Sequence, residues 1–438
     1  MTSAITGGLG AVAFALIAFG IAQFFVTIGM GFRERLVAIE RDDRLAELFP
    51  EPDSLISEMY LVIPALNEER VIEGTVRAAL KANAAVRVIV VDDASDDQTA
   101  AIVESIGSDR VKLIRRKHPH AQLGKGEALN QAFRWLVAHV DRARLDARKV
   151  AVCIMDADGR LSPGAVAVIQ RVFADENVAG VQLPVRIRNT GTILTDYQDF
   201  EFWGLSAIQQ LARGKTHTVS LGGNGQFTRL SALRQLPKEP WSSSLTEDLD
   251  LAVSLLALGW KIESTPNAWV SQQAVETLGP LIRQRTRWMQ GHLLSAARLT
   301  EIRRSTLAAD SVLEVTNYLM VPLLMILPWS IVFNISLATT WVTIRGLPEV
   351  EVFGMEGLGT FIVLAYVLVM SLFPHAIAGV IYRSRRPELP WSRALLLGVG
   401  FVFYNFVTFA ATWKALVRIA RGENEWTKTA RSVEPSAA

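Results

Sequence analysis

The chain has 438 residues, of which 50% are hydrophobic and 20% are charged. This composition is too apolar for an ordinary soluble enzyme and too charged for a protein that lies wholly within a membrane. The net charge of +2 is nearly balanced, so we expect no nucleic-acid partner. The only cysteine, Cys153, lies in an apolar run, where we expect a small buried side chain that forms no intrachain disulfide.

The first predicted element is a hydrophobic helix near the N-terminus. Residues 5–32 contain no charged side chain, and Arg33 and Arg35 follow at once. This stretch is long enough to cross a bilayer as a helix. A cleaved signal peptide is the alternative, but the stretch is longer than a typical apolar core and has no basic start before it. We therefore expect a retained transmembrane helix over residues 1–35.

Residues 36–275 are predicted to form one α/β domain. The apolar runs YLVIP, VRVIVVDD, VKLIRR and VAVCIMD alternate with helical patterns, near residues 71–82, 99–106, 124–139 and after Pro163. Strands that are hydrophobic throughout and separated by helices belong to a mostly parallel sheet that is covered on both faces. Ligands bind such sheets at the carboxyl ends of the strands, so the polar residues there are the candidate site.

Two acidic motifs stand at predicted strand ends. Asp92 and Asp93 end one strand, where a carboxylate could accept hydrogen bonds from a base or a ribose. Asp156 and Asp158 end another, and their spacing lets both carboxylates approach one hard cation, Mg²⁺ or Mn²⁺, and its diphosphate. Helix capping before Thr99 and a solvated turn are the respective alternatives. The position at strand ends favours the functional interpretation of both motifs.

Three further residues near predicted helix starts could contact a nucleotide. Asn67 and Glu68 follow the first strand, although helix capping is the commoner use of such residues. Lys125 stands between Gly124 and Gly126, where a flexible backbone and a cation at a helix start suit a phosphate-bearing ligand. A plain turn explains this glycine pair equally well, since the spacing of a Walker motif is absent.

A third acidic pair, Glu247 and Asp248, precedes an apolar helical pattern. The pair therefore stands at a helix N-terminus, where the helix dipole favours negative charge, and capping alone would account for it. In the functional interpretation Asp248 is the general base that takes a proton from an acceptor hydroxyl, and Glu247 belongs to the same catalytic group. The Gly-Gly-Asn-Gly run at residues 222–225 would let the backbone approach a sugar or acceptor closely.

Residues 276–311 are predicted to form amphipathic helices at the membrane interface. The run QRTRW at residues 284–288 lies there in a pattern rich in arginine, tryptophan and leucine. Arg287 and Trp288 could simply anchor this helix among lipid headgroups. They could equally place a guanidinium against a leaving diphosphate and an indole ring on a sugar, and the two roles can coexist.

Residues 312–414 are predicted to contain three more membrane spans, because residues 315–344, 357–382 and 394–413 lack Asp, Glu, Lys and Arg. The loop with Glu349, Glu351 and Glu356 is acidic and the next loop is basic, which places the basic loop and the α/β domain in the cytoplasm. Three spans would put the tail, residues 415–438, outside, although its basic residues argue for inside. Pro322 and Pro328 offer a re-entrant or interfacial segment as the alternative. We expect an integral protein of the plasma or inner membrane that contacts membrane lipids.

These motifs, in this order, resemble the family 2 glycosyltransferases of the GT-A fold, in the membrane-embedded branch that includes cellulose, hyaluronan and poly-N-acetylglucosamine synthases. The resemblance covers roughly residues 60–288. It implies a UDP-sugar donor, an inverting single displacement and a growing polysaccharide as acceptor. The resemblance implies that Asp92 and Asp93 contact the uridine, and that Asp156 and Asp158 hold the metal and the diphosphate. It also implies that Asp248 is the catalytic base. Finally, it implies that the acceptor and the diphosphate are bound by Gln284, Arg287 and Trp288.

Two departures leave other functions open. The predicted spans are fewer than in several synthases, so a polymer channel would have few walls, and GGNGQFTR followed by TEDLDL also resembles enzymes that place one sugar on a membrane lipid. A transporter is suggested by the apolar segments and His375 within one of them, but the large α/β insertion argues against it. In the tail, Trp426, Thr427 and Arg431 resemble a terminal element that closes over the donor in some synthases.

Overall fold

The computed structural model describes residues 2–344 and 358–423. They divide into two compact units, each described here by itself. The sheet unit comprises Met30–Thr277 and Leu294–Thr316, and the helical unit comprises Met1–Gly29, Leu278–Leu293 and Asn317–Asn424. The acidic loop predicted at Glu349, Glu351 and Glu356, and the tail element at residues 426–431, lie outside the described residues.

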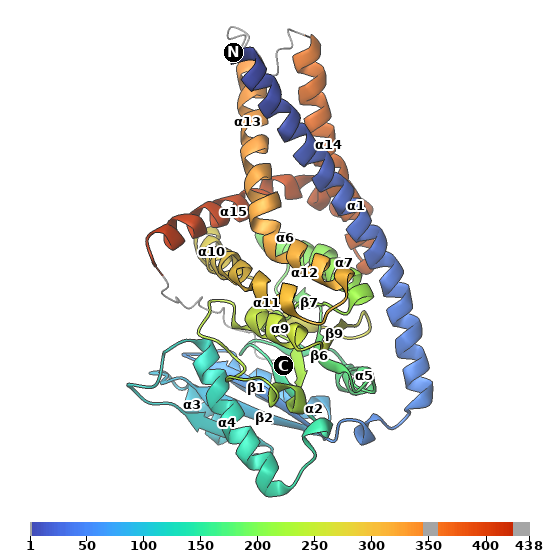
Figure 1. Ribbon diagram of the computed structural model, residues 1–438. Helices are drawn as coiled ribbons and strands as arrows, with labels where there is room; N and C mark the ends of the chain where they lie inside the picture. The colour runs from blue at the N-terminus through green and yellow to red at the C-terminus, as the bar shows by residue number, and fades with distance from the viewer. Residues whose placement is uncertain (1, 345–357, 424–438) are drawn as a thin grey trace. The chain divides into compact units, whose positions relative to one another are not determined.

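The sheet unit is built on a seven-stranded sheet with the order β3-β2-β1-β4-β8-β6-β9. Figure 1 labels β1, β2, β6 and β9 of this sheet. Only β8 runs antiparallel to its neighbours, β4 and β6, and every other pair in this sheet is parallel. The predicted α/β class with a mostly parallel sheet is therefore confirmed. The strands are β1 (Glu58–Ala65), β2 (Val86–Asp92), β3 (Val111–Arg115), β4 (Val150–Ile154), β6 (Val178–Gln182), β8 (Gln226–Arg229) and β9 (Lys261–Ser264).

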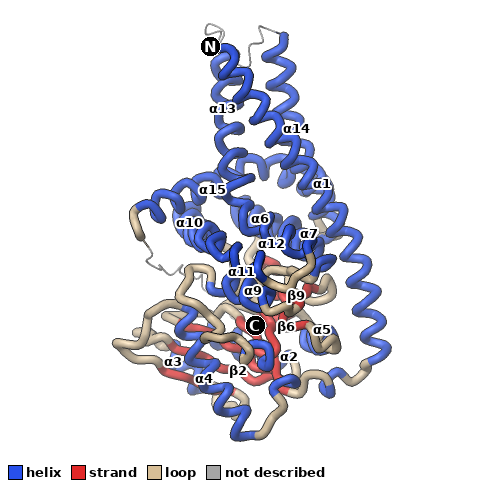
Figure 2. Tube along the Cα trace, viewed as in Figure 1, coloured by secondary structure: helices blue, strands red, loops and turns tan. Residues whose placement is uncertain are grey.

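Helices cover both faces of this sheet (Figure 2). Helices α2 and α3 connect β1 to β2 and β2 to β3 in one direction across the sheet, and α4 connects β3 to β4 in the other direction. Because such crossover connections are right-handed, α4 lies on the face opposite to α2 and α3. In α2 the buried Ile72, Val76 and Ala79 recur at helical spacing and pack on the sheet. The helices are α2 (Ile72–Ala82), α3 (Thr99–Ser105), α4 (Lys125–Ala143), α5 (Ala165–Val172), α6 (Ile193–Asp199), α7 (Ala207–Ala212), α8 (Leu230–Leu233), α9 (Glu247–Ala257) and α11 (Leu299–Arg304).

A second, three-stranded sheet has the order β5-β10-β7, with β5 (Arg160–Leu161), β10 (Val270–Gln272) and β7 (Val185–Ile187). Strand β5 follows the turn at the end of β4 directly, and β10 pairs antiparallel with β5 and parallel with β7. The small sheet therefore starts at the carboxyl edge of the large sheet and extends the surface there.

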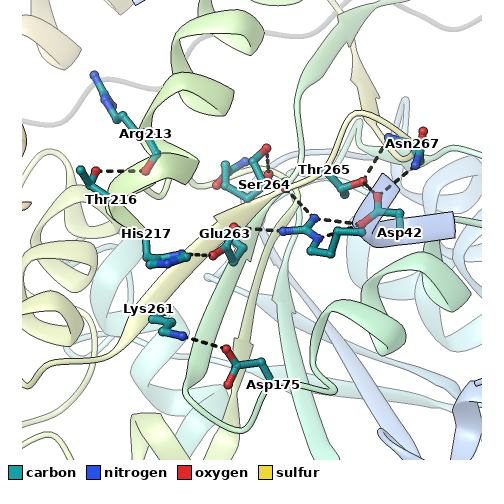
Figure 3. Close-up of polar contacts among 12 residues, drawn as sticks. Asp42, Asp175, Arg213, Thr216, His217, Lys261, Glu263, Ser264, Thr265 and Asn267 are labelled. Carbon is teal, nitrogen blue, oxygen red and sulfur yellow. Dashed lines mark hydrogen bonds and ion pairs between the residues drawn. The ribbon is translucent and has the colours of Figure 1, made fainter. Parts of the chain in front are cut away.

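The N-terminal helix α1 (Thr2–Leu48) continues well past residue 35, and its last part belongs to the sheet unit. There Asp42 accepts hydrogen bonds from Thr265 Oγ1 at 2.5 Å and Asn267 Nδ2 at 3.0 Å (Figure 3). Arg41 donates to Glu263 at 3.1 Å, and Glu263 also contacts His217 at 2.5 Å. The helix extends this far because its polar residues find partners at the edge strand β9 and in the loop after it.

The helical unit contains most of α10 (Leu278–Ser295), part of α12 (Ala309–Val321), α13 (Leu327–Ile344), α14 (Leu358–Arg385) and α15 (Trp391–Ala420). Pro322 does not interrupt the chain of helices, because a π-helical turn, Pro322–Ile326, joins α12 to α13. Gly379 and Gly398 let α14 and α15 approach closely, since a Cβ on Gly398 would lie 3.0 Å from the Gly379 Cα. His375 on α14 hydrogen-bonds Asn405 on α15 at 3.0 Å. Within the described parts of the chain, two segments are long and apolar enough to cross a membrane, Ala309–Ile335 and Trp391–Ala420.

Candidate active site

The turn after β4 carries Asp156 and Asp158 and is held from three directions. Thr75 on α2 donates its hydroxyl to the carbonyl of residue 157 at 2.6 Å, and Asn224 accepts from the Asp156 N–H at 3.2 Å. Asp158 is fully buried, and its Oδ2 accepts from the Gln273 N–H at 2.9 Å. The turn is therefore a fixed part of the fold, and Asp156, whose side chain is 28% exposed, is its accessible carboxylate.

The ammonium group of Lys125 lies among the predicted catalytic acids. Helix α4 begins at this residue, directly after Gly124 with φ 109°. Lys125 Nζ lies 3.0 Å from Asp156 Oδ1 and 3.7 Å from Glu247 Oε1. Burial opposes the charge of the ammonium, but the carboxylates of Asp156, Glu247 and Asp248 outweigh it and raise the pKa of Lys125 above its usual value. The structure thus brings together four of the predicted site residues.

Asp248 stands in the first turn of α9, as the sequence predicted, and one of its oxygens accepts from the Leu249 N–H at 2.7 Å. Burial, and then the neighbouring charge of Glu247, raise the pKa of Asp248 to about 7, while Lys125 opposes the shift. A carboxylate with a pKa near neutrality can take up a proton during a reaction and release it afterwards. Asp248 is therefore suited to general-base chemistry.

The glycine loop at residues 222–225 closes this group of residues. A Cβ on Gly223, whose φ is +69°, would lie 2.8 Å from Asp248 Oδ2 and 3.3 Å from Lys125 Nζ. The missing side chain leaves room beside the base. The buried Gln182 at the end of β6 holds the loop, because it accepts from the Gly222 N–H at 2.8 Å and donates to the Asn224 carbonyl at 2.8 Å.

Sequence reasoning missed the residues that anchor the loop and the turn. Asn224 links them, since it accepts from Asp156 and donates to Gln272 Oε1 at 2.7 Å. Its place among glycines was the one available signal. Gln182 and Thr75 gave none, because each is a single polar residue whose partner lies far away in the chain.

Asp92 and Asp93 follow a different pattern of contacts at the neighbouring strand. Asp92 is buried and accepts from the Ser95 N–H at 3.3 Å. Asp93 forms a buried ion pair with Arg116 at 2.6 Å and accepts from the Gln122 N–H at 3.0 Å. Arg116 also donates to the His120 carbonyl. Asp93 therefore ties together the segment that leads to Lys125.

Asn67 and Glu68 form hydrogen bonds that connect the loop after β1 to the loop after β2. Asn67, with φ 54°, accepts from the Asp96 N–H at 3.0 Å, and its own N–H donates to Ser95 Oγ at 2.9 Å. Glu68 donates its N–H to Thr99 Oγ1 at 2.8 Å. The side chain of Asn67 thus holds the loop after β2, and the predicted alternative of capping the following helix does not apply to it, since the N-cap position of α2 is Val71.

The residues present fit a divalent cation that is shared with a diphosphate. Among the described residues, no three His, Cys, Asp or Glu side chains form a group that could hold a metal by themselves. Mg²⁺ is commonly bound through one or two carboxylates, with substrate phosphates and water completing the shell. Asp156, the accessible carboxylate of the turn after β4, fits such a ligand, whereas Asp158 on the same turn is buried and its Oδ2 accepts from the Gln273 N–H.

The QRTRW run lies in α10 of the helical unit, which confirms the helix predicted there. Gln284 is buried, and the Arg285 guanidinium lies 4.3 Å from the centroid of the Trp288 ring. Two residues further along the helix, Gln290 donates to the Glu423 carbonyl at 2.6 Å and accepts from Arg418 at 2.8 Å. The roles of Gln284, Arg287 and Trp288 toward a substrate stay predictions.

Comparison with known proteins identifies the family to which this sequence is similar. Residues 57–291, just over half of the chain, match the family described as glycosyltransferase-like family 2. A probable glycosyltransferase, YdaM, of Bacillus subtilis is 29% identical over 58% of this chain and 61% of its own length. A beta-monoglucosyldiacylglycerol synthase of Trichormus variabilis is 27% identical over 62% and 58%. A poly-beta-1,6-N-acetyl-D-glucosamine synthase of Staphylococcus aureus is 27% identical over 55% and 57%. The chain thus spans less than two thirds of the length of these relatives.

Among solved structures, a mannosyltransferase of Pyrobaculum calidifontis, determined with GDP-Man and Mn²⁺, has a TM-score of 0.54 and 16% sequence identity. The match covers 93% of this chain and 99% of that one. At this identity the likeness shows the fold, and it agrees with the mixed, mostly parallel sheet with flanking helices described above.

Proposed function

Because the chain belongs to the glycosyltransferase-like family 2 and has the predicted GT-A fold, we propose that it transfers a hexose or N-acetylhexosamine from a UDP-sugar, with inversion, to an acceptor hydroxyl. One observation supports this most directly. Asp248, with a pKa near 7, faces a glycine of the 222–225 loop and lies in the same group of side chains as Lys125 and Asp156. A base, a cation and the acids for a diphosphate are the groups that such a transfer requires.

In this mechanism Asp248 takes the proton of the acceptor hydroxyl as the oxygen attacks the anomeric carbon. The bond from that carbon to the diphosphate breaks at the same time, and UDP leaves with the electron pair. Gly223 leaves the space that the acceptor needs beside Asp248. Glu247 stays beside the base, where its charge holds the pKa of Asp248 near neutrality.

The donor's diphosphate would bind where Lys125 meets the turn after β4. Lys125 would move from Asp156 to the departing phosphate oxygens and stabilise their charge. Asp156 and Asp158 would hold Mg²⁺ or Mn²⁺ together with the diphosphate, and the ion supplies positive charge that stabilises the UDP leaving group. At the neighbouring strand, Asp92, Asp93, Asn67 and Glu68 would frame the uridine, with Asp93 acting through the loop that it ties to Arg116.

We propose a growing β-linked polysaccharide as the acceptor, in keeping with the synthase of Staphylococcus aureus. The second candidate is a single transfer to a membrane lipid, which the similarity to the beta-monoglucosyldiacylglycerol synthase of Trichormus variabilis favours. In both cases Gln284, Arg287 and Trp288 on α10 would serve the acceptor and the diphosphate.

We also propose that the protein is integral to the plasma or inner membrane, with the sheet unit in the cytoplasm. The two long apolar segments support this placement, and so do the arginines within residues 383–393, which cover the end of α14, the connecting loop and the start of α15. A UDP-sugar is then available to the site, and membrane lipids contact the apolar helices.

A product assay tests the function. The purified full chain is incubated with Mg²⁺ or Mn²⁺ and a panel of radiolabelled UDP-hexoses and UDP-N-acetylhexosamines, with and without lipid acceptors. We expect UDP release together with label in a high-molecular-weight, glycosidase-sensitive product. Label that extracts into organic solvent would support the lipid acceptor instead. No UDP release and no labelled product with any donor, although UDP binds, would overturn the proposed activity.

A further inference from the structure

Asp250 stands two residues after the proposed base on α9 and joins three segments of the sheet unit. One carboxylate oxygen accepts from Ser242 Oγ at 2.6 Å. The other accepts from Ser295 Oγ at 3.1 Å and lies 3.9 Å from the Arg298 guanidinium. Neither the proposed proton transfer nor the proposed donor contacts use this residue. Its bonding capacity is directed at the neighbouring segments of the protein.

Asp250 and its partners Ser242, Ser295 and Arg298 form a junction, and its Ser242 side packs on the helix that begins at Lys125. The main chain at residue 242 lies against the first turn of α4, because a Cβ on Gly126 would come within 2.1 Å of the Ser242 carbonyl oxygen. The preceding residue is clamped to the same helix, since Asn130 donates to the Trp241 carbonyl at 2.7 Å and accepts from the Trp241 N–H at 3.1 Å. The segment at 241–242 is therefore fixed to the helix that begins with Lys125.

The other side of Asp250 contacts Ser295, the last residue of α10, and Arg298, which follows that helix. Arg298 donates to the Asp250 carbonyl at 2.5 Å and to Ser254 Oγ at 2.9 Å, so it binds one turn of α9 twice. Ser295 is buried. The first turn of α9 is thus held between two segments, one attached to α4 and the other formed by Ser295–Arg298 at the end of α10 and just after it.

We propose that Asp250 is a positioning residue that fixes the distance between the base on α9 and the ammonium group at the start of α4. Lys125 and Asp248 sit at the first turns of two different helices, and no strand connects those turns directly. The hydrogen bond between Asp250 and Ser242 connects the first turn of α9 to the segment that packs on the first turn of α4. A displacement of a catalytic group by about 1 Å can lower the rate about a hundredfold, so the loss of this link is expected to slow turnover. The inference rests on the proposed function, because it assigns Asp250 a role in that transfer.

The test compares the full-length variants Asp250→Ala, Ser242→Ala and the double variant with the wild type. We expect kcat to fall about 10- to 100-fold in Asp250→Ala, and less in Ser242→Ala, while KM for the UDP-sugar changes little. The double variant should be no slower than Asp250→Ala, because Ser242→Ala removes a bond that Asp250→Ala has already broken. Asp141→Ala is the matched control, since it removes an exposed link at 2.8 Å between α4 and Arg234 and should leave kcat unchanged.

Thermal unfolding of the same four proteins supplies a readout that needs no turnover. If Ser242 and Asp250 act through their shared bond, the loss of Tm in the double variant should be smaller than the sum of the two single losses. Additive losses, or wild-type kcat in Asp250→Ala, would overturn the inference. A wild-type protein that transfers no sugar would count against the proposed function instead, and the Tm comparison would still decide whether the junction exists.

Discussion

Two groups of acids stand at the same edge of the large sheet, and they differ in what surrounds them. Asp92 and Asp93 are bound by backbone N–H groups and by Arg116, which fix loops in place. Asp156, Glu247 and Asp248 instead surround a lysine, and burial with mutual repulsion raises the pKa of Asp248 to about 7. A position at a strand end or a helix start brings a carboxylate to this edge of the sheet. The groups around the carboxylate then decide whether it stabilises the fold or is available for proton transfer.

The strongest test of this contrast is the removal of the base from the second group. Asp248→Asn keeps the shape of the side chain but cannot accept the acceptor's proton, so kcat should fall by about 10²- to 10⁴-fold. UDP affinity, measured by calorimetry, should stay close to that of the wild type, because the base does not hold the nucleotide. Normal turnover in this variant would assign the base to another residue.

A change in the first group should act on stability. Arg116→Met leaves the Asp93 carboxylate buried without its ion-pair partner, which should lower the free energy of unfolding by about 3–5 kcal/mol. The neighbouring Arg115→Met is the matched control, because the Arg115–Glu104 pair is exposed and should contribute less than about 1 kcal/mol. Chemical denaturation would measure both. Equal effects of the two substitutions would mean that the buried pair does not fix the loop.

The pH dependence of transfer sharpens the comparison further. Asp248 must be unprotonated to act as a base, so kcat/KM should rise with pH and level off above about 7, the pKa of this carboxyl. Glu247→Gln removes a charge that raises this pKa, and the rise should therefore move to lower pH. Profiles of both proteins, each normalised to its own plateau, would show the shift. Superimposable profiles would contradict the assigned cause.

The smallest loss of stability is expected when Asn67, which connects the loops after β1 and β2, is replaced. The backbone there has φ 54°, a left-handed conformation that asparagine and glycine tolerate better than alanine. Asn67→Ala also removes the hydrogen bond to Asp96, and stability should fall by about 1 kcal/mol. Asn67→Gly keeps the backbone conformation and separates the two contributions in the same thermal-unfolding experiment. A larger loss for glycine than for alanine would show that φ is not the cause.

Much of the α/β framework could be predicted because it depends on local patterns. The four apolar runs became β1, β2, β3 and β4, and α4 and α9 begin at Lys125 and Glu247, where the motifs placed helix starts. The expectation that the acids gather at one edge followed from the parallel order of the strands. The antiparallel β8 and the small sheet were not predicted, since their short strands carry little pattern of their own.

The sequence by itself determined which residues could do chemistry, because residue type and position at strand ends and helix starts are local properties. Only the tertiary structure decided their partners. Lys125 reaches Asp156 and Glu247, Asp93 is committed to Arg116, and Asp250 bridges to Ser242, all through contacts between distant segments. The pKa of Asp248 depends on the same contacts, since burial and neighbouring charges act through space, and neither can be read from the order of residues along the chain.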